Sequence, residues 1–491
     1  MPASTDTRVP ARILVPLIVA CALFMENLDS TVLATSLPAI ARELNEDPID
    51  LKLALTSYLL SLAIFIPVSG WLADRLGARL VFRAAIAVFA LGSLLAGFSG
   101  SMGEIVGARI VQGMGGAMMV PVGRLVILKS VPKSEIVGAL AWLTIPALIG
   151  PVLGPPVGGF ITTYFSWRWI FWINLPIAAL GLVLASLYIP DFREERRTPF
   201  DTVGFLLSGF GLASIVSGST ALGLDALPHW VAAVILAAGA LALWSYMRHA
   251  SRVEHPILDL RLFQIPTFRA AIVGGSLFRV GIGASPFLLP LMLQLGFGLS
   301  AFQSGMLTFA SALGALVMKF TAKPILRRFG FRATMAVNAL IAAAAMTAPA
   351  MFSATTPSLI ILAALLIGGF FRSLEFTAVN ALAYADVDNE RVSGATSIAS
   401  VAQQLSLSVG VSIAALGLES ILAARGGTEL QAADFPIAFL IVGLISASSV
   451  FVFMRLAPDA GEQVSGHVTP KADAVKAVGE TDPVAAAREP G

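Results

Sequence analysis

Long apolar segments recur along the 491-residue chain, and each is long enough to cross a lipid bilayer as a helix. Crossing about 30 Å of hydrocarbon takes ~20 helical residues. The chain is 57% hydrophobic and 13% charged, whereas ordinary soluble domains are roughly 45 to 50% apolar and about 25% charged. The sequence therefore predicts an all-α membrane protein with fourteen spanning helices, at about residues 13–35, 53–73, 81–99, 104–127, 136–162, 169–189, 203–223, 230–248, 268–293, 302–322, 333–352, 358–384, 393–417 and 435–456.

The basic residues predict the orientation of the chain, because cytoplasmic loops of inserted proteins are enriched in Lys and Arg. With the N-terminus inside, 24 of the 32 Lys and Arg residues fall on cytoplasmic segments and 4 on external ones. We therefore expect a multi-pass protein of the bacterial cytoplasmic (inner) membrane, with both termini in the cytoplasm. A cleaved signal peptide is the competing interpretation of the first apolar run, but acidic residues interrupt that run and further spans follow it.

The residue types that most catalytic and metal sites need are scarce. The chain has one cysteine, Cys21, and four histidines, none of which falls within a predicted span. A membrane-embedded enzyme would need a metal or nucleophile cluster at one depth, so we expect no enzyme activity and no metal site. The sequence contains no phosphate-cradling Walker motif, which argues against ATP as the energy source. The net charge of +2 reflects short basic loops, and we expect no nucleic-acid partner.

Two short turns, at residues 70–82 and 323–335, resemble each other, with Gly77 matched to Gly330. Internal duplication is common in secondary transporters, which place substrate between two repeated bundles. After residue 457 few large apolar residues occur, which predicts disorder. The expected organisation is an N-terminal six-helix bundle at 1–190, a linker with two inserted transmembrane helices at 191–250, a C-terminal six-helix bundle at 251–457 and a disordered cytoplasmic tail at 458–491.

Several short motifs occur in a fixed order along the chain: LDSTVLATSLP (28–38), GWLADRLGAR (70–79), RIVQGMGGA (109–117), GPVLGPPVGG (150–159), WRWIFWINLPI (167–177), HPILDLRLF (255–263) and LPLMLQLGFGLS (289–300). In this order and spacing they resemble the major facilitator superfamily, and within it the fourteen-helix drug/proton antiporters of the EmrB/QacA type, with closeness to an MdtD-like subgroup. The resemblance implies a proton-coupled exporter of small lipophilic, drug-like compounds that works by alternating access. It also implies that the proton-motive force is the energy source and that no cofactor is used.

The first predicted span contains two carboxylates, Glu26 and Asp29, although an ionised Asp near the centre of a membrane helix costs about 2.5 to 3.5 kcal/mol. At about 1.5 Å per residue, Asp29 lies at the same depth as Arg109 of the fourth span. The same arithmetic places Glu26 level with Gln112. Each pair is spaced i, i+3, so both acids can share one face opposite Arg109 and Gln112.

By resemblance, Asp29 and Arg109 take part in proton coupling. A nearby arginine favours the ionised form of an acid and burial disfavours it, so a movement that alters the contact makes the acid bind or release a proton. Glu26 is not part of the shared motif, and it either binds a cationic substrate or tunes Asp29. A static ion pair, or a permanently protonated carboxyl group, is the alternative for both acids.

In the turn GWLADRLGAR, the resemblance implies a latch that holds the two bundles together on the cytoplasmic side. Its residues are Gly70, Asp74, Arg75, Gly77 and Arg79. The alternative is a basic loop that only fixes topology. The second copy carries Arg327 where Asp74 would fall, so such a latch is asymmetric.

The fifth span carries GPVLGPPVGG, which by resemblance is the antiporter motif at the interface between bundles. Small residues at four-residue spacing let another helix approach closely, and prolines favour a bend. A purely structural kink is the alternative. The residues singled out are Gly150, Pro151, Gly154, Gly158 and Gly159.

Other polar groups at membrane depth are candidates for a central substrate cavity, with interhelical hydrogen bonding as the alternative. Arg372 and Glu375 are three residues apart, and they form either a second functional site or a self-neutralised pair. Arg279 needs an acceptor, for which Glu26 and Glu375 are candidates. A dedicated metabolite exporter is the alternative function, and a channel or a nontransporting regulator is disfavoured. Membrane lipid is an expected partner, whereas an adaptor or an outer-membrane channel leaves no signal in the sequence. The candidate cavity residues are Tyr58, Gln112, Asn338, Arg372, Glu375, Asn380, Gln403 and Gln404.

Overall fold

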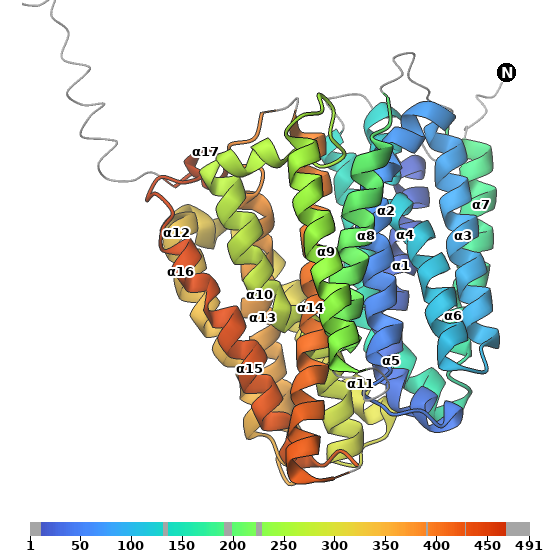
Figure 1. Ribbon diagram of the computed structural model, residues 1–491, viewed down its shortest axis with the longest axis vertical. Coiled ribbons are helices and arrows are strands. Elements are labelled where there is room, and N and C mark those ends of the chain that lie inside the picture. Colours follow the sequence, from blue (N-terminus) through green and yellow to red (C-terminus); the bar gives the residue numbers. More distant parts are fainter. Residues whose placement is uncertain are drawn as a thin grey trace, which may run out of the picture.

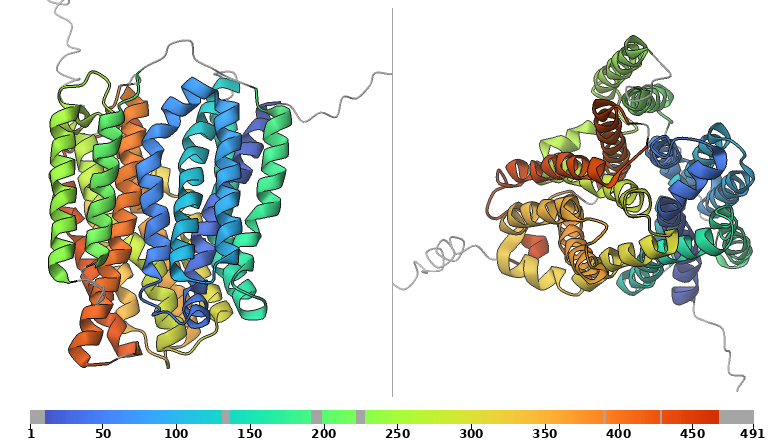
Figure 2. Two further views of the ribbon diagram at one scale, coloured as in Figure 1. Left: turned by 45° about the vertical axis from the view of Figure 1, so that its right-hand side comes forward. Right: turned by 90° about the horizontal axis from the view of Figure 1, so that it is seen from below.

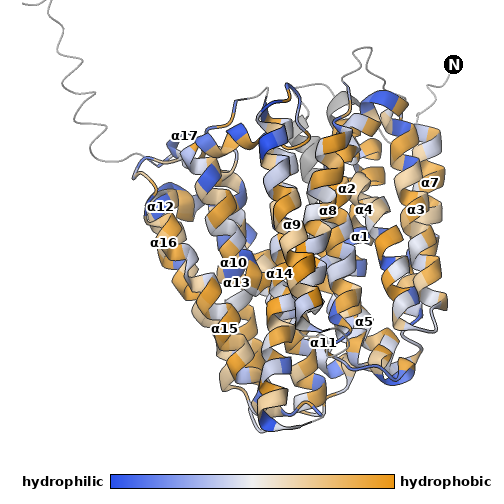
Figure 3. Ribbon diagram, in the orientation of Figure 1, coloured by the Kyte–Doolittle hydropathy of each residue, from blue (hydrophilic) through white to orange (hydrophobic). Residues whose placement is uncertain are grey.

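The computed structural model describes residues 11–130, 136–190, 199–221, 228–388, 391–427 and 429–467. Within these residues the fold is helical and contains no strand. Thirteen of the described helices are long and apolar enough to cross a membrane, judged by length and composition. The helix α5 (Ile136–Tyr164) is the counterpart of the remaining predicted span. The prediction of an all-α membrane protein is therefore confirmed, and apolar residues dominate the middle of the molecule in Figure 3.

The helices form two groups that lie side by side (Figure 1; Figure 2, right). The first group comprises α1 (Ala11–Leu44), α2 (Lys52–Leu76), α3 (Ala78–Phe98), α4 (Met102–Ser130), α5, α6 (Trp169–Trp172) and α7 (Asn174–Tyr188). The second comprises α10 (Pro266–Leu291), α11 (Ala301–Lys319), α12 (Ala322–Thr347), α13 (Ser358–Leu382), α14 (Val392–Arg425), α15 (Phe435–Ala447) and α16 (Ser449–Phe453).

The predicted helix boundaries are mostly close, but α1 and α14 extend well beyond the predicted apolar cores of 13–35 and 393–417. Hydropathy identifies only the apolar segment of a helix. The helix itself can extend beyond that segment, because its backbone hydrogen bonds are formed within the helix. The start of α12 differs as well, because residues 322–329 are helical where a turn was predicted, and the helix breaks at Gly330.

The predicted repeat is visible in the backbone. Gly77 separates α2 from α3 with a φ of 95°, and its matched residue Gly330 breaks α12 with a φ of 70°. Residues with a side chain rarely adopt a positive φ, whereas glycine does so readily, which explains a glycine at this position in both copies.

The two inserted helices, α8 (Thr202–Ala221) and α9 (His229–Ala250), pack on the outside of the seam between the groups (green in Figure 2). Leu212 of α8 forms one apolar cluster with Ala63 of α2 and Val401 of α14. The pair is joined at one end by Asp201, whose carboxylate lies 2.6 Å from Nε2 of His249. Burial alone would raise the pKa of Asp201, but the hydrogen bonds from His249 and from two backbone amides outweigh it, so the pKa is lowered.

Buried apolar residues form separate clusters at one end of the molecule and a shared cluster at the other. At the end where α1 begins, one cluster belongs to α1–α7 and another to the second group. At the opposite end a single cluster crosses between the groups and includes Leu33, Leu55, Phe287, Leu291 and Leu418. The two groups therefore share a core at the end where α1 finishes.

The start of the predicted disordered tail is ordered. Residues 458–467 include the short helix α17 (Glu462–Ser465), which packs on α12, and Nδ1 of His467 lies 3.1 Å from the carbonyl oxygen of Arg327. The expectation of disorder is wrong for these residues, because contacts with α12 supply the packing that their composition lacks. The rest of the predicted tail, 468–491, lies outside the described residues.

Candidate functional site

The carboxylate of Asp29 lies at the centre of a buried polar network. Its Oδ2 accepts a hydrogen bond of 2.5 Å from Nη1 of Arg109, and its Oδ1 accepts bonds of 2.8 Å from both Gln112 and Asn174. Ser93 accepts bonds from the same two amides. The side chains of Asp29 and Arg109 are each 1% exposed. The predicted proximity of Asp29 and Arg109 is confirmed.

Further contacts fix the orientation of the Arg109 guanidinium. Its Nε donates to the carbonyl oxygen of Ala54 at 3.1 Å, and its Cζ lies 4.1 Å from the centroid of the Tyr58 ring. Because Gln112 follows Arg109 by one helical turn, α4 presents both side chains to Asp29. A buried ion pair is tolerated only when its remaining polar atoms are satisfied, and most of those in this network are.

Glu26, one turn before Asp29, lies outside this network. It lines a cavity between the two groups of helices, and its Oε2 has no hydrogen-bond partner among the described residues. Gln112, which was expected at the same depth as Glu26, bonds through its amide to Asp29 and Ser93 and not to Glu26. The two acids of α1 therefore have different environments.

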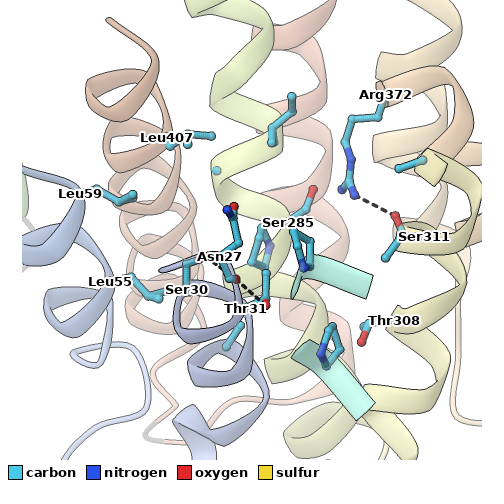
Figure 4. A pocket seen from close by; sticks show the side chains of 18 of the residues that line it. Asn27, Ser30, Thr31, Leu55, Leu59, Ser285, Thr308, Ser311, Arg372 and Leu407 are labelled. Atoms are coloured by element: carbon cyan, nitrogen blue, oxygen red, sulfur yellow. Dashed lines mark hydrogen bonds between the residues drawn. The ribbon is translucent and has the colours of Figure 1, made fainter. Parts of the chain in front are cut away.

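The cavity has a volume of about 510 Å³ and is lined by α1, α2, α4 and α5 on one side and by α10, α11, α13 and α14 on the other. Both groups of helices contribute, so a movement of one group against the other changes the shape of the cavity. Figure 4 shows part of the lining, which includes leucines together with hydroxyl and amide groups. Such a mainly apolar cavity with a few polar groups is typical of a small-molecule site.

The predicted cavity residues divide into two sets. Tyr58, Arg372, Gln403 and Gln404 line the cavity. The other four lie elsewhere, where each takes part in a hydrogen bond: Gln112 with Asp29, Asn338 with Glu375 and Asn380 with Arg279.

Arg372 and Glu375 do not pair with each other in the structure. Arg372 donates to Oγ of Ser311 at 2.8 Å, whereas Glu375 is fully buried and accepts a bond of 2.7 Å from Nδ2 of Asn338. Arg279 finds its acceptor in Oδ1 of Asn380 at 2.7 Å, so neither Glu26 nor Glu375 serves that purpose. Spacing along one helix brings residues to one face, but it does not decide which neighbouring helix supplies the partner.

The glycines of GPVLGPPVGG allow α5 to pack directly on α1. A Cβ atom added at Gly154 would lie 1.9 Å from Oγ1 of Thr31, and one added at Gly158 would lie 2.6 Å from the carbonyl oxygen of Val32. The last glycine, Gly159, faces the other group of helices, since a Cβ there would lie 2.4 Å from the carbonyl oxygen of Ala301 in α11. The motif therefore contacts the helix that carries both acids and also the second group.

Comparison with known proteins identifies the family. The model of the Major Facilitator Superfamily matches residues 19–202 and 271–482. The chain belongs to the major facilitator superfamily. Over 454 residues it is 38% identical to a protein of Pectobacterium atrosepticum named as multidrug resistance protein MdtD, covering 91% of this chain and 96% of that one. The relative of the same name in Salmonella heidelberg is 37% identical over 454 residues, covering 90% and 94%.

Solved structures of the major facilitator superfamily share the fold. A crystal structure of a D-xylose–proton symporter matches with a TM-score of 0.66 at 16% identity, covering 91% of this chain and 98% of that one. The gap in the superfamily match, 203–270, coincides with the inserted helices α8 and α9. The two matched segments therefore correspond to the two groups of helices, and the unmatched segment contains the helices that pack outside them.

The segment GWLADRLGAR comprises the end of α2, Gly77 and the first two residues of α3. Arg75 stacks over the ring of Trp71, with its Cζ 5.1 Å from the centroid, and Nη2 of Arg79 donates to the carbonyl oxygen of Ser186 in α7. Gly70 faces open space, and Asp74 lies in the last turn of α2. The turn therefore lies at the end of the molecule where the apolar clusters of the two groups are separate.

Sequence reasoning missed an ion pair between the two halves of this superfamily member. Lys52 at the start of α2 contacts Glu419 near the end of α14, and the lysine side chain is only 1% exposed. Lys52 is one of the four basic residues assigned above to external segments, and nothing in the sequence links it to a residue 367 positions away. Asn174 was missed as a ligand of Asp29, although it is a polar residue within the apolar motif WRWIFWINLPI.

Proposed function

We propose that the protein is a proton-coupled secondary active exporter, an H⁺ antiporter of small lipophilic, drug-like compounds that works by alternating access. The observation that carries this proposal is the buried Asp29–Arg109 pair, whose arginine lines the cavity between the bundles. A carboxylate held by an arginine and two amides can exchange its proton when helix movement alters those contacts. The name of the MdtD relatives supports drug-like compounds as the exported class.

The structure supports an inward-facing state when the end where α1 begins is assigned to the cytoplasm, as the basic loops favour. The shared apolar cluster and the Lys52–Glu419 contact close the opposite, external end. Substrate would enter from the cytoplasm or the inner leaflet, and inward proton flow through Asp29 would reset the carrier.

The remaining predictions form part of the same proposal. The protein would lie in the bacterial inner membrane with both termini in the cytoplasm, use the proton-motive force and need no cofactor. Its N-terminal bundle would end at residue 190, the segment with the inserted helices at 250 and the C-terminal bundle at 457. Glu26 would assist Asp29, the turn from Gly70 to Arg79 would latch the bundles on the cytoplasmic side, and the glycines of α5 would form the sliding surface.

The test of this proposal is a substrate-induced pH change in everted vesicles energised by respiration. A panel of lipophilic anions, cations and neutral drugs would be added while a fluorescent dye reports the pH of the lumen. We expect alkalinisation on addition of at least one compound, because each exported molecule is exchanged for protons. Vesicles without the protein provide the control. The absence of any response to the whole panel would refute drug/proton antiport and favour the second candidate, a dedicated metabolite exporter, which a metabolite panel would then test.

The contact between Lys52 and Glu419 gives a prediction about closure of the external end. In a Cys21→Ser background with a cysteine at Thr308 in the cavity, Lys52→Gln should speed labelling by an impermeant maleimide from the external face about tenfold. That factor corresponds to ~1.4 kcal/mol in the closing equilibrium. The reason is that Glu419 loses its partner at the closed interface.

Two further variants make this prediction specific. The exchange Lys52→Glu with Glu419→Lys should return labelling to near the original rate. Arg168→Gln serves as a matched control, because Arg168 pairs with Glu43 at the same end but within one bundle, and it should leave labelling unchanged. Equal acceleration by Arg168→Gln, or none by Lys52→Gln, would contradict a gating role for the Lys52 contact.

A further inference from the structure

The ionisable groups of the cavity are unevenly divided between its two walls. Besides Tyr58, four ionisable side chains line it: Glu26, Arg109, Lys319 and Arg372. Arg109 is neutralised by Asp29. Of the other three, the single acid is on α1, whereas both cations are on the neighbouring helices α11 and α13 of the second bundle.

Among the described residues, neither of the two cations has a counter-ion. Nη2 of Arg372 donates to Oγ of Ser311, and Nζ of Lys319 donates to Oγ1 of Thr377, each at 2.8 Å. Within the part of the chain that the structure describes, no carboxylate lies within 4.0 Å of either cation. Figure 4 shows Arg372 reaching from its helix toward Ser311 at the cavity wall. A guanidinium at membrane depth without an anion is costly, and an anionic ligand would supply the missing partner.

The neighbouring side chains suit the rest of such a ligand. The hydroxyl group of Ser311 lies on the same wall as the cations and can donate to a carboxylate or sulfonate, whereas those of Thr308 and Ser373 donate to backbone carbonyl oxygens. Leu59, Leu289 and several other apolar side chains surround the remaining space, which suits a hydrophobic body. Lys319 is the last residue of α11 and is exposed, so it lies on the approach to the cavity from the end where α1 begins.

We propose that the exported compounds are amphiphilic organic anions whose acid group binds to Arg372. Lys319, about 12 Å along α11 from Ser311, the partner of Arg372, would attract the anion toward the cavity. This inference rests on the proposed export function, and it narrows the drug-like class to lipophilic acids. The opposite wall offers Glu26 and no unpaired cation to a second anionic group in the same molecule, so monoanions, and zwitterions whose cationic group faces α1, fit best.

The experiment measures binding rather than transport, so that its failure is distinguishable from failure of the antiport proposal. The full-length protein in lipid nanodiscs would be titrated with three probes that share one ring system: anthracene-9-carboxylate, 9-anthracenemethanol and 9-(aminomethyl)anthracene. Empty nanodiscs give the background from partitioning. We expect the carboxylate to bind most tightly and the amine most weakly.

The variant Arg372→Gln should weaken binding of the carboxylate probe about tenfold, the size of one charge-assisted hydrogen bond, whereas Lys319→Gln should weaken it less, because Lys319 attracts the anion from a distance. Binding of the alcohol should stay unchanged. Arg372→Lys should keep most of the affinity, and Arg332→Gln, which removes an exposed arginine of α12 in the same bundle, should keep all of it. Thermal unfolding of each variant checks that the fold is intact.

Tighter binding of the amine than of the carboxylate would overturn the proposal, and so would unchanged carboxylate affinity in a folded Arg372→Gln variant. Carboxylate binding without a pH response in vesicles would instead uphold this site and refute proton coupling.

Discussion

Asp29→Asn is expected to abolish the substrate-induced alkalinisation of everted vesicles while substrate binding persists. The asparagine cannot carry the exchanged proton, and the cavity wall itself does not include Asp29. The same change leaves Arg109 buried without a counter-charge, which costs about 3 to 5 kcal/mol of folding stability. Vesicle pH, ligand binding and thermal unfolding are the three measurements.

A double variant separates loss of coupling from loss of stability. Asp29→Asn combined with Arg109→Gln removes both charges, so it should unfold at a higher temperature than Asp29→Asn alone and still show no proton response. If the double variant regained the response, Asp29 would have only a structural role, and Glu26, the other acid of α1, would be the next candidate for the proton site.

Gly159→Val is expected to reduce transport to near background without loss of the folded protein. A Cβ atom at this position would lie 2.4 Å from the carbonyl oxygen of Ala301, and backbone cannot move aside as a flexible side chain can. Since the two atoms belong to different bundles, the bundles could not close at the external end. Export rate and maleimide labelling of a cysteine at Thr308 from the external face would show the loss of transport and the gain of access.

The matched control for this prediction is Gly107→Val in α4, where an added Cβ meets no atom within 4 Å. It should leave export and labelling unchanged. A second comparison is Gly154→Val, which clashes with Thr31 inside the first bundle and should lower the yield of folded protein instead. Wild-type transport by Gly159→Val would show that close packing of α5 on α11 is not needed in the cycle.

The arrangement of Asp29 and Arg109 could be predicted because it depends on quantities that the sequence contains. The rise of a helix and the thickness of a bilayer fix the depth of each residue, and only a few charged residues share that depth. The same reasoning could not choose the partner of Gln112, since Asp29 and Glu26 lie one turn apart on α1. Side-chain direction, set by packing, decided between them.

Contacts between the two bundles were beyond sequence reasoning. Lys52 and Glu419 lie at opposite ends of the chain, and their pairing depends on how far the bundles have closed. Arg372 and Glu375 illustrate the same limit within one bundle, because each found a partner on a neighbouring helix. The spacing of residues along a helix predicts which of them share a face. Which neighbouring helix packs on that face depends on the fold.

The position of α8 and α9 has a consequence for how lipophilic compounds arrive. The bundles meet along two seams, one between α2 and α14 and one between α5 and α11. The inserted pair covers the first seam through contacts such as Phe205 with Phe65, whose ring centroids are 6.0 Å apart. Molecules dissolved in the bilayer would therefore enter the carrier from the α5–α11 side, because the inserted helices shield the other seam from lipid.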